Sequence, residues 1–261
     1  KQVNKGVSGT VRYAIIYRPQ ERINWTMSLS FRSVKTYYDK IGRKLNQYNK
    51  ENLSKNLTRY YDGGSPTALW AVRSAGIDPA TGKEIFLTKD GKPTFQHSYD
   101  NEVVVGNTNP DVEGVWSNSL YWKGFSLNLH IRYSLGGQRF NSTLYEKVEN
   151  ISVAGLSQNQ DRRALYDRWQ KPGDKTKFKG ISRTEITPIS SRFVQDNNYI
   201  AIESARLAYE FPQRWMEHVR FSGLTVSAYM NDICRFSTIK DERGISYPFA
   251  RSVSMSVSIN F

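Results

Sequence analysis

The residue types that most often carry out catalysis or bind metals are few in this sequence and far apart. The three histidines are His97, His130 and His218, and the single cysteine is Cys234. General acid–base catalysis and zinc binding both need such groups at a close, regular spacing, and these four do not have it. A lone cysteine also excludes an intrachain disulfide. We therefore expect no enzyme active site, no bound metal and no cofactor.

Two sets of charged residues could bind a ligand, but each has a simpler structural explanation. Calcium binding would need the spacing of an EF-hand, which Asp78, Asp90 and Asp100 lack, so these three are expected to cap turns. The other set could be a ligand surface, but a solvated helical face is the simpler interpretation. It consists of Asp161, Arg162, Arg163, Asp167 and Arg168.

Aromatic side chains near arginines are the better candidates for ligand binding. Aromatic rings stack on sugars and peptides, and arginine binds carboxylates and hydroxyls. One such set lies around the Gly63-Gly64 turn and consists of Tyr60, Tyr61, Trp70 and Arg73. A second, weaker set consists of Tyr145, Tyr166 and Trp169. The alternative is that these loops pack on their own aromatic residues or against a partner protein.

The last strand of the chain indicates which elements position these loops. Val253, Met255, Val257 and Ile259 alternate with Ser or Asn, and the chain ends on Phe261. Side chains of a strand alternate between its two faces, so one face is apolar and the other polar. A half-buried strand of a soluble sandwich has this pattern. So does a strand of a membrane β-barrel, with its apolar face toward lipid.

The same alternation predicts seven strands, and the connections between them alternate in length. Two strands lie within 8–33, two within 113–134, and one begins at Tyr199, with a bulge near Glu203. The sixth runs from about Leu224, and the last ends at Phe261. Short connections are expected at 18–22, 123–124 and 212–221, and long ones at 34–111, 135–198 and 237–246. Outer-membrane barrels have this asymmetry, whereas a soluble sandwich has no reason for it.

The long connections are expected to carry structure of their own. Residues 68–75 and 85–87 could form a small hairpin, and 141–150 and 160–170 short helices. Seven is an odd number, so the chain should be part of a larger barrel whose other strands lie outside it. Two further barrel strands within 66–90, making nine, are the alternative. The first residue is Lys1 rather than Met, and we expect the gene product to begin earlier.

Net charge is +13 and the mean hydropathy is −0.60, with no apolar run long enough for a transmembrane helix. A strongly basic chain could bind nucleic acid or another anionic polymer. The lysines and arginines are dispersed, however, and no nucleic-acid-binding motif is present. We expect solvated basic loops and no nucleic-acid partner.

Short motifs along the whole chain resemble the C-terminal third of SusC/RagA-type TonB-linked outer-membrane transporters. Each is a simple turn or strand signature, but their order, followed by a terminal Phe261, is specific. They lie at 76–82 with 90–91, and at 104–110, 121–125, 163–174, 191–194, 229–232 and 247–252.

The resemblance implies a fold, a process and several partners. The fold is the C-terminal part (1–261) of a 22-stranded transmembrane antiparallel β-barrel with long extracellular loops, filled by a plug that this chain does not contain. The process is import of oligosaccharides or peptides, energised through TonB, with a SusD-like lipoprotein as lid. Phe261 would be read by the barrel-assembly machinery at the periplasmic side. Val253, Met255, Val257 and Ile259 would face the lipids of a Gram-negative outer membrane.

The residues leave other functions open. A barrel of this kind could be a surface-binding, adhesin-like protein without transport activity. A soluble basic β protein is the third possibility. Glycan and peptide substrates are not distinguished, because both bind aromatic-rich loops.

Overall fold

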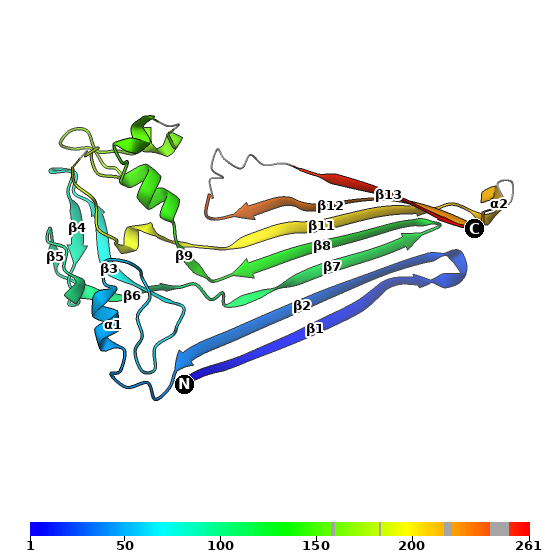
Figure 1. Cartoon of the computed structure of the whole chain (residues 1–261), viewed down its shortest axis with the longest axis horizontal. Coiled ribbons are helices and arrows are strands. Elements are labelled where there is room, and N and C mark those ends of the chain that lie inside the picture. Colours follow the sequence, from blue (N-terminus) through cyan, green and yellow to red (C-terminus); the bar gives the residue numbers. More distant parts are fainter. Residues whose placement is uncertain (158–159, 183, 217–220, 241–250) are drawn as a thin grey trace.

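The computed structural model describes residues 1–157, 160–182, 184–216, 221–240 and 251–261. Its main element is a seven-stranded antiparallel sheet in the order β1-β2-β7-β8-β11-β12-β13 (Figure 1). Its strands are β1 (Gln2–Arg18), β2 (Ile23–Tyr38), β7 (Val112–Trp122), β8 (Phe125–Leu135), β11 (Tyr199–Glu210), β12 (Gly223–Ser237) and β13 (Val253–Asn260). All seven expected strands are confirmed. In the sheet, β1 and β13 are the two edge strands.

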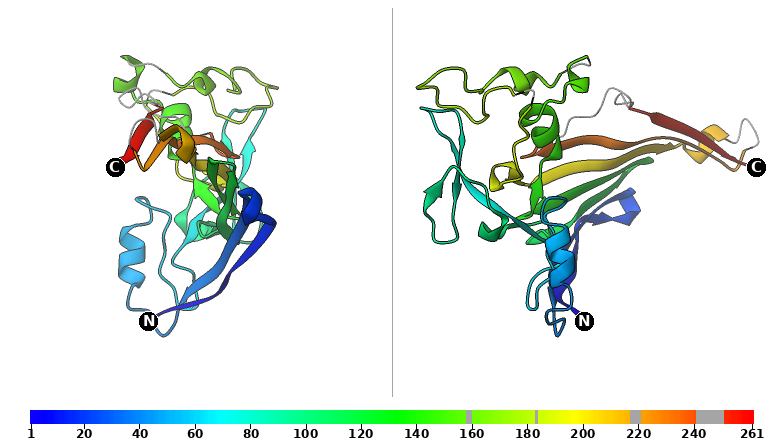
Figure 2. Two further views of the ribbon diagram at one scale, coloured as in Figure 1. Left: turned by 90° about the vertical axis from the view of Figure 1, so that its right-hand side faces the viewer. Right: turned by 60° about the vertical axis from the view of Figure 1, so that its left-hand side comes forward.

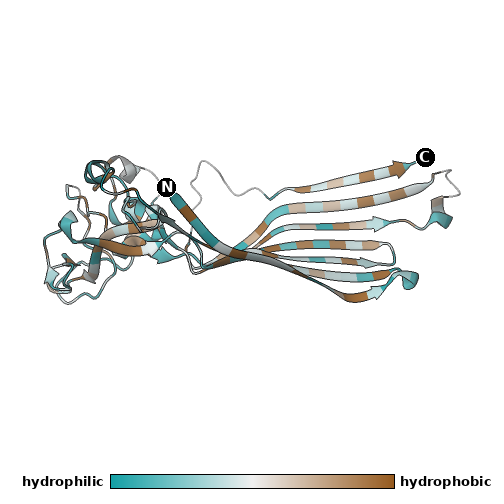
Figure 3. Cartoon of the chain, turned by 90° about the horizontal axis from the view of Figure 1, so that it is seen from below, coloured by the Kyte–Doolittle hydropathy of each residue, from teal (hydrophilic) through white to brown (hydrophobic). Residues whose placement is uncertain are grey.

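The strands are in register so that apolar residues gather on one face of the sheet. One row across six strands joins Ile23, Trp122, Phe125, Tyr209, Val226 and Val257. The neighbouring positions are mostly polar, and the hydroxyls of Ser227 and Ser256 lie 2.8 Å apart. Figure 3 shows apolar and polar positions alternating along much of the sheet. We call these the apolar face and the polar face.

All short connections lie at one end of the sheet together with the C-terminus (Figure 1). The first contains η1 (Pro19–Glu21), and the third contains α2 (Gln213–Met216). Lys123 and Gly124 both have positive φ, at 46° and 99°, as a two-residue hairpin turn requires. Aromatic rings follow one another here, from Trp122 over Phe125, Tyr209 and Phe211 to Trp215.

The long connections 39–111 and 136–198 fold together at the other end of the sheet, and we call them the loop module (Figure 2). Its strands are β3 (Ala68–Ile77), β4 (Glu84–Leu87), β5 (Pro93–Thr94) and β6 (Glu102–Asn107), with a second pair, β9 (Gln138–Phe140) and β10 (Val194–Asp196). Its helical turns are α1 (Asn46–Glu51), η2 (Tyr99–Asn101), η3 (Leu144–Glu149), η4 (Ala154–Ser157), η5 (Arg162–Leu165) and η6 (Ser191–Phe193).

The hydrophobic core lies in the loop module rather than against the sheet. Leu144, Val148, Phe178 and Phe193 form one buried cluster. A second contains Leu57, Leu69 and Ala71. The apolar residues of the sheet stay exposed, among them Val257 at 62% and Met255 at 80%. A sheet with an apolar exposed face and a polar exposed face cannot be stable in water on both sides, so this arrangement fits a wall between lipid and an aqueous channel.

Three expectations need correction. The strands at 68–75 and 85–87 exist as β3 and β4 and pair with each other as the expected small hairpin, but together with β5 and β6 they form a separate four-stranded sheet, so the nine-strand alternative is wrong for the main sheet. The helix at 160–170 is reduced to the single turn η5, whereas that at 141–150 is present as η3. Asp161 and Arg168 are buried, not on a solvated helical face, because Arg168 donates to two backbone carbonyls inside the module.

Candidate functional site

Charged side chains cross the polar face near the loop module, and we call them the charge belt. The belt consists of Arg32, Glu113, Arg132, Glu203 and Arg235, from five neighbouring strands. Arg32 lies 3.8 Å from Glu113, and Arg132 binds both carboxylate oxygens of Glu203. The guanidinium of Arg235 lies over the ring of Tyr199, 4.0 Å from its centroid. Basic and acidic groups thus alternate across the face and leave a net positive charge.

A bulge explains how Glu203 enters the belt. The expected irregularity is confirmed, because the register of β11 shifts between Ile202 and Ser204 against both neighbouring strands. Against β8 the extra residue is Glu203, whereas against β12 the extra residue lies in β12, where Asp232 and Ile233 stand opposite Glu203. A bulge adds one residue to a strand and re-aims its side chain. This places the carboxylate beside Arg132 on the polar face, while Ile202 stays paired with Ile131.

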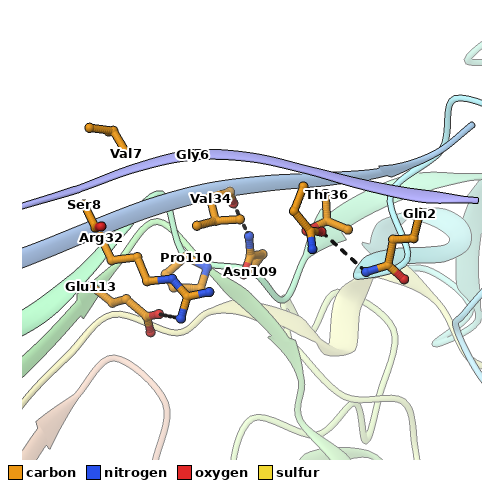
Figure 4. A pocket seen from close by; sticks show the side chains of 11 residues that line it. Gln2, Gly6, Val7, Ser8, Arg32, Val34, Thr36, Asn109, Pro110 and Glu113 are labelled. Carbon is orange, nitrogen blue, oxygen red and sulfur yellow. Dashed lines mark hydrogen bonds and ion pairs between the residues drawn. The ribbon is translucent and has the colours of Figure 1, made fainter.

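Two grooves hollow the polar face at opposite ends of the belt, and belt residues line both of them. One has a volume of about 380 Å³ and is lined by amides and hydroxyls of β1 and β2, with Asn109 and the Arg32–Glu113 pair (Figure 4). The second has a volume of about 990 Å³ and lies over β11 and β12 at the bulge, with Tyr199, Asp232 and Arg235 in its wall. Such amide, hydroxyl and guanidinium groups can bind the polar backbone of a peptide or the hydroxyls of a sugar.

The structure brings together part of the first predicted aromatic set. The rings of Tyr61 and Trp70 are 5.1 Å apart, and Tyr61 is 40% exposed. Tyr60 instead packs between Tyr38 and Tyr48, at 5.6 and 5.5 Å. Tyr61 and Trp70 therefore form an accessible aromatic pair, whereas Tyr60 belongs to a separate aromatic cluster.

Arg73 does not join that aromatic pair. Its Nη2 donates to the carbonyl oxygens of Thr88 and Lys89, both at 3.0 Å. This guanidinium ties β3 to the turn after β4.

The second predicted set is dispersed. Tyr145 packs against Phe193 and donates from its hydroxyl to the carbonyl of Thr187 at 2.9 Å, and burial raises the pKa of this phenol. Trp169 donates from Nε1 to the carbonyl of Pro79 at 2.9 Å. Tyr166 is 57% exposed, with the guanidinium of Arg162 over its ring. Of the three, Tyr166 alone presents an open ring.

A buried ion network in the loop module was not predicted from sequence. Arg192 binds Glu84 at 2.9 Å and Glu149 at 2.7 Å. Burial acts to lower the pKa of Arg192, but its hydrogen bonds to the carboxylates of Glu149 and Glu84, together with their negative charges, outweigh burial, so the pKa is raised. Arg168 has a lowered pKa because of burial. No sequence spacing indicated this network, because its members come from both long loops.

The histidines and acidic residues lie apart from one another in the described part of the chain. No group of three or more metal-binding side chains occurs there. His130 lies on the polar face, 2.9 Å from the Ser117 hydroxyl, and Asp78 caps the turn that follows it. His218 and motif residues 247–250 lie outside the described residues. Among the described residues, no helix is long and apolar enough to span a membrane.

The predicted residues of the last strand occupy one face and one end of the sheet. Val253, Met255 and Val257 pair with Met230, Ala228 and Val226 on the apolar face, and Ile259 follows in the same alternation opposite Leu224. Phe261 lies at the end with the short connections and contacts Phe221, with ring centroids 5.3 Å apart.

Comparison with known proteins gives a consistent result. No protein-family model matches the chain. A curated relative, TonB-dependent receptor P3 from Formosa agariphila, is 26% identical over 158 residues, which cover 60% of this chain and 14% of the relative.

Solved structures of the RagAB system have the same fold. The RagAB peptide transporter matches with a TM-score of 0.72 at 20% identity, over 91% of this chain and 26% of the other. The RagAB peptide importer in its "closed-closed" state matches with a TM-score of 0.73 at 19% identity, over 91% and 26%. The chain thus spans about a quarter of the matched structures. It has the fold of part of the RagA barrel, and its resemblance to SusC/RagA-type TonB-dependent transporters is confirmed.

Proposed function

We propose that this chain is the C-terminal part of the barrel of an outer-membrane transporter that imports large nutrients. The observation that carries the proposal is the two-faced sheet, whose exposed apolar face and charged polar face suit lipid and an aqueous channel. The gathering of all short turns at one end supports the same placement. In this proposal the loop module is extracellular and Phe261 is periplasmic, where the assembly machinery reads it.

The partners follow from the same proposal. A SusD-like lipoprotein covers the loop module as a lid, and TonB supplies energy through a plug outside this chain. Peptides are the first substrates to test, because the matched structures are named as peptide transporters or importers. Oligosaccharides are the second. The curated relative is named a receptor and the matched structures a transporter and an importer, and we propose no enzymatic activity.

Uptake by cells that express the full-length protein tests the proposal. We expect accumulation of labelled oligopeptides that requires the gene and stops when a protonophore removes the proton-motive force. A lipoprotein should copurify with the protein in mild detergent. Binding without protonophore-sensitive uptake would instead indicate a surface-binding, adhesin-like barrel. Recovery of the full-length protein in the soluble fraction would contradict the proposal.

Within this function, Tyr61 and Trp70 are the proposed substrate contacts among the predicted residues. Their rings contact each other and Tyr61 is accessible, whereas Tyr145 is engaged in the core. We expect Tyr61→Ala to raise the substrate concentration for half-maximal uptake severalfold, through loss of about 1 kcal/mol of ring contact. Tyr145→Phe is the control and should leave uptake unchanged. Equal effects of both variants on uptake would contradict the proposed contact between Tyr61 and the substrate.

A further inference from the structure

Two lysines lie directly opposite each other on the apolar face of the edge hairpin. The register pairs Lys5 of β1 with Lys35 of β2. Lys5 is six residues from Val11, and the register from Gln2 to Ala14 is unbroken. Because side chains alternate strictly along a strand, both lysines share the face of Val11 and Leu29. Like charges directly opposite each other destabilise a sheet unless a third group compensates them.

The described part of the chain supplies no acidic group that compensates the two lysines. Neither lysine forms an ion pair there. Of the acidic residues adjoining this part of the hairpin, Asp39 pairs with Lys1 at 3.1 Å and Glu113 lies 3.8 Å from Arg32. Both lysines are exposed. The Nζ atom of Lys5 lies over the ring of Tyr37, 5.4 Å from its centroid, which gives it one weak partner.

The position of the pair along the hairpin is the second observation. The apolar face of the hairpin runs from Ile23, beside Trp122, past Phe31, whose ring covers Gly9, to the row that pairs Val7 with Ser33. From Ile23 to Ser33 the strand rises about 33 Å. At a tilt of about 40° this corresponds to about 25 Å, the height of the apolar band of an outer-membrane barrel. The next row outward is Lys5–Lys35, so the pair stands at the boundary of the band on the side of the loop module.

We propose that Lys5 and Lys35 together bind the phosphate group of a lipid in the leaflet on the loop-module side. Two ammonium groups on one face can donate to a single phosphate, which removes their repulsion and forms charge-assisted hydrogen bonds. Val7 and Val11 lie below the pair along the same face of β1 and are 60% and 62% exposed. They give the acyl chains of that lipid an apolar surface. This inference rests on the membrane placement proposed above.

The test uses the full-length protein purified in detergent, with phosphorylated lipid A, dephosphorylated lipid A and inorganic phosphate as probes. We expect phosphorylated lipid A to bind and to raise the melting temperature, and the other two probes to have little effect. Lys5→Gln with Lys35→Gln should weaken binding of phosphorylated lipid A on the order of tenfold. Lys5→Arg with Lys35→Arg should retain it, because the charge is kept.

The control is Arg12→Gln, which removes one positive charge from the same strand. Arg12 pairs with Ser28 on the polar face, so lipid binding should be unchanged. The inference is overturned if dephosphorylated lipid A binds as tightly, if inorganic phosphate alone gives the same shift, or if Arg12→Gln is equally damaging. The inference also fails if the double Gln variant is less stable than the wild type by the same amount with and without lipid. The lysines would then stabilise the protein through contacts within it.

Membrane fractionation keeps this inference separate from the proposed function. If the full-length protein is absent from the outer membrane, the proposed function itself fails. If the protein is in the outer membrane and imports peptides but does not distinguish the lipids, only the lysine site is wrong.

Discussion

Arg59 and Glu102 form a two-point ion pair inside the loop module, with Nη2 to Oε1 at 2.6 Å and Nε to Oε2 at 2.9 Å. The Arg59 side chain is fully buried and that of Glu102 is 9% exposed. Arg59 also donates to backbone carbonyls, including that of Leu53 at 3.0 Å. Burial raises the pKa of Glu102, and the hydrogen bond and charge of Arg59 act against that rise. The pair joins the segment before β3 to the start of β6.

Removing one member of this pair should destabilise the loop module strongly. Arg59→Met leaves the Glu102 carboxylate buried without its partner, and we expect a loss of about 3–5 kcal/mol. Hydrogen exchange of the β3 and β6 amides measures this change. Asp167→Asn is the matched control, because it breaks an exposed pair with Lys177, and exposed pairs contribute little. Equal protection in both variants would contradict the assigned role of Arg59.

His97 should make the loop module sensitive to acid. Its ring packs between Phe86 and Tyr99, at 5.1 and 4.7 Å, and its Nε2 is buried without a hydrogen-bond partner in the described structure. Burial lowers the pKa of His97 from its ordinary value of 6.5. The neutral ring is therefore favoured in the folded state.

The sign of the pH effect follows from that lowered pKa. The stability contributed by His97 is fully present above its unfolded pKa and is lost as pH falls through the lower folded pKa. Protease resistance of the loop module should decline in this window in the wild type. His97→Phe keeps an aromatic ring and does not titrate, so the protease resistance of this variant should decline less as pH falls. An identical pH profile for the two proteins would exclude His97 as a contributor.

The face assignment of β13 predicts unequal effects of two neighbouring substitutions. Val257 pairs with Val226 on the apolar face, whereas Ser256 lies beside Ser227 on the polar face. Val257→Asp places a charge against lipid and should reduce the amount of assembled barrel, whereas Ser256→Asp should have little effect. Heat-modifiable migration of outer-membrane protein on gels measures assembly. Similar losses in both variants would mean that the faces are assigned wrongly.

Gly82 should be far less replaceable than Gly91. Both have positive φ, at 70° and 81°, so alanine is strained at either position. At Gly82 an added Cβ would also lie 2.5 Å from the Trp169 ring, whereas at Gly91 it would meet open space. The difference in unfolding free energy between Gly82→Ala and Gly91→Ala isolates the Trp169 contact. We expect the first variant to expose 78–83 to proteolysis and the second to leave that segment protected.

The sheet could be predicted from sequence because its strands meet different environments on their two faces. Lipid and water select opposite residue types, so the period of two is visible in strands such as that of Leu127 and Leu129. The bulge at Glu203 was visible for the same reason, since an extra residue interrupts the period. The Arg132–Glu203 pair could have been found by extending this logic, because both residues occupy polar positions beside the bulge.

The loop module was less predictable because its contacts join residues far apart in the sequence. Asp161 and Arg168 resembled a solvated face, but tertiary packing buries both. Arg73 and Trp70 are close in sequence, yet the Arg73 guanidinium binds backbone carbonyls and does not join Trp70 in an aromatic site. No local spacing of residues in the sequence predicts that Arg192 binds carboxylates from two separate loops.

The ion network around Arg192 has a mechanical consequence for the barrel. Glu84 belongs to the connection between β2 and β7, whereas Glu149 and Arg192 belong to that between β8 and β11. The Ser190 hydroxyl donates to Glu84 at 2.6 Å, and the backbone amide of Ser74 donates to the Ser191 hydroxyl at 3.0 Å. These ion pairs and hydrogen bonds thus hold the two connections together as one rigid unit. A force applied to either of them is transmitted to the ends of four strands at once.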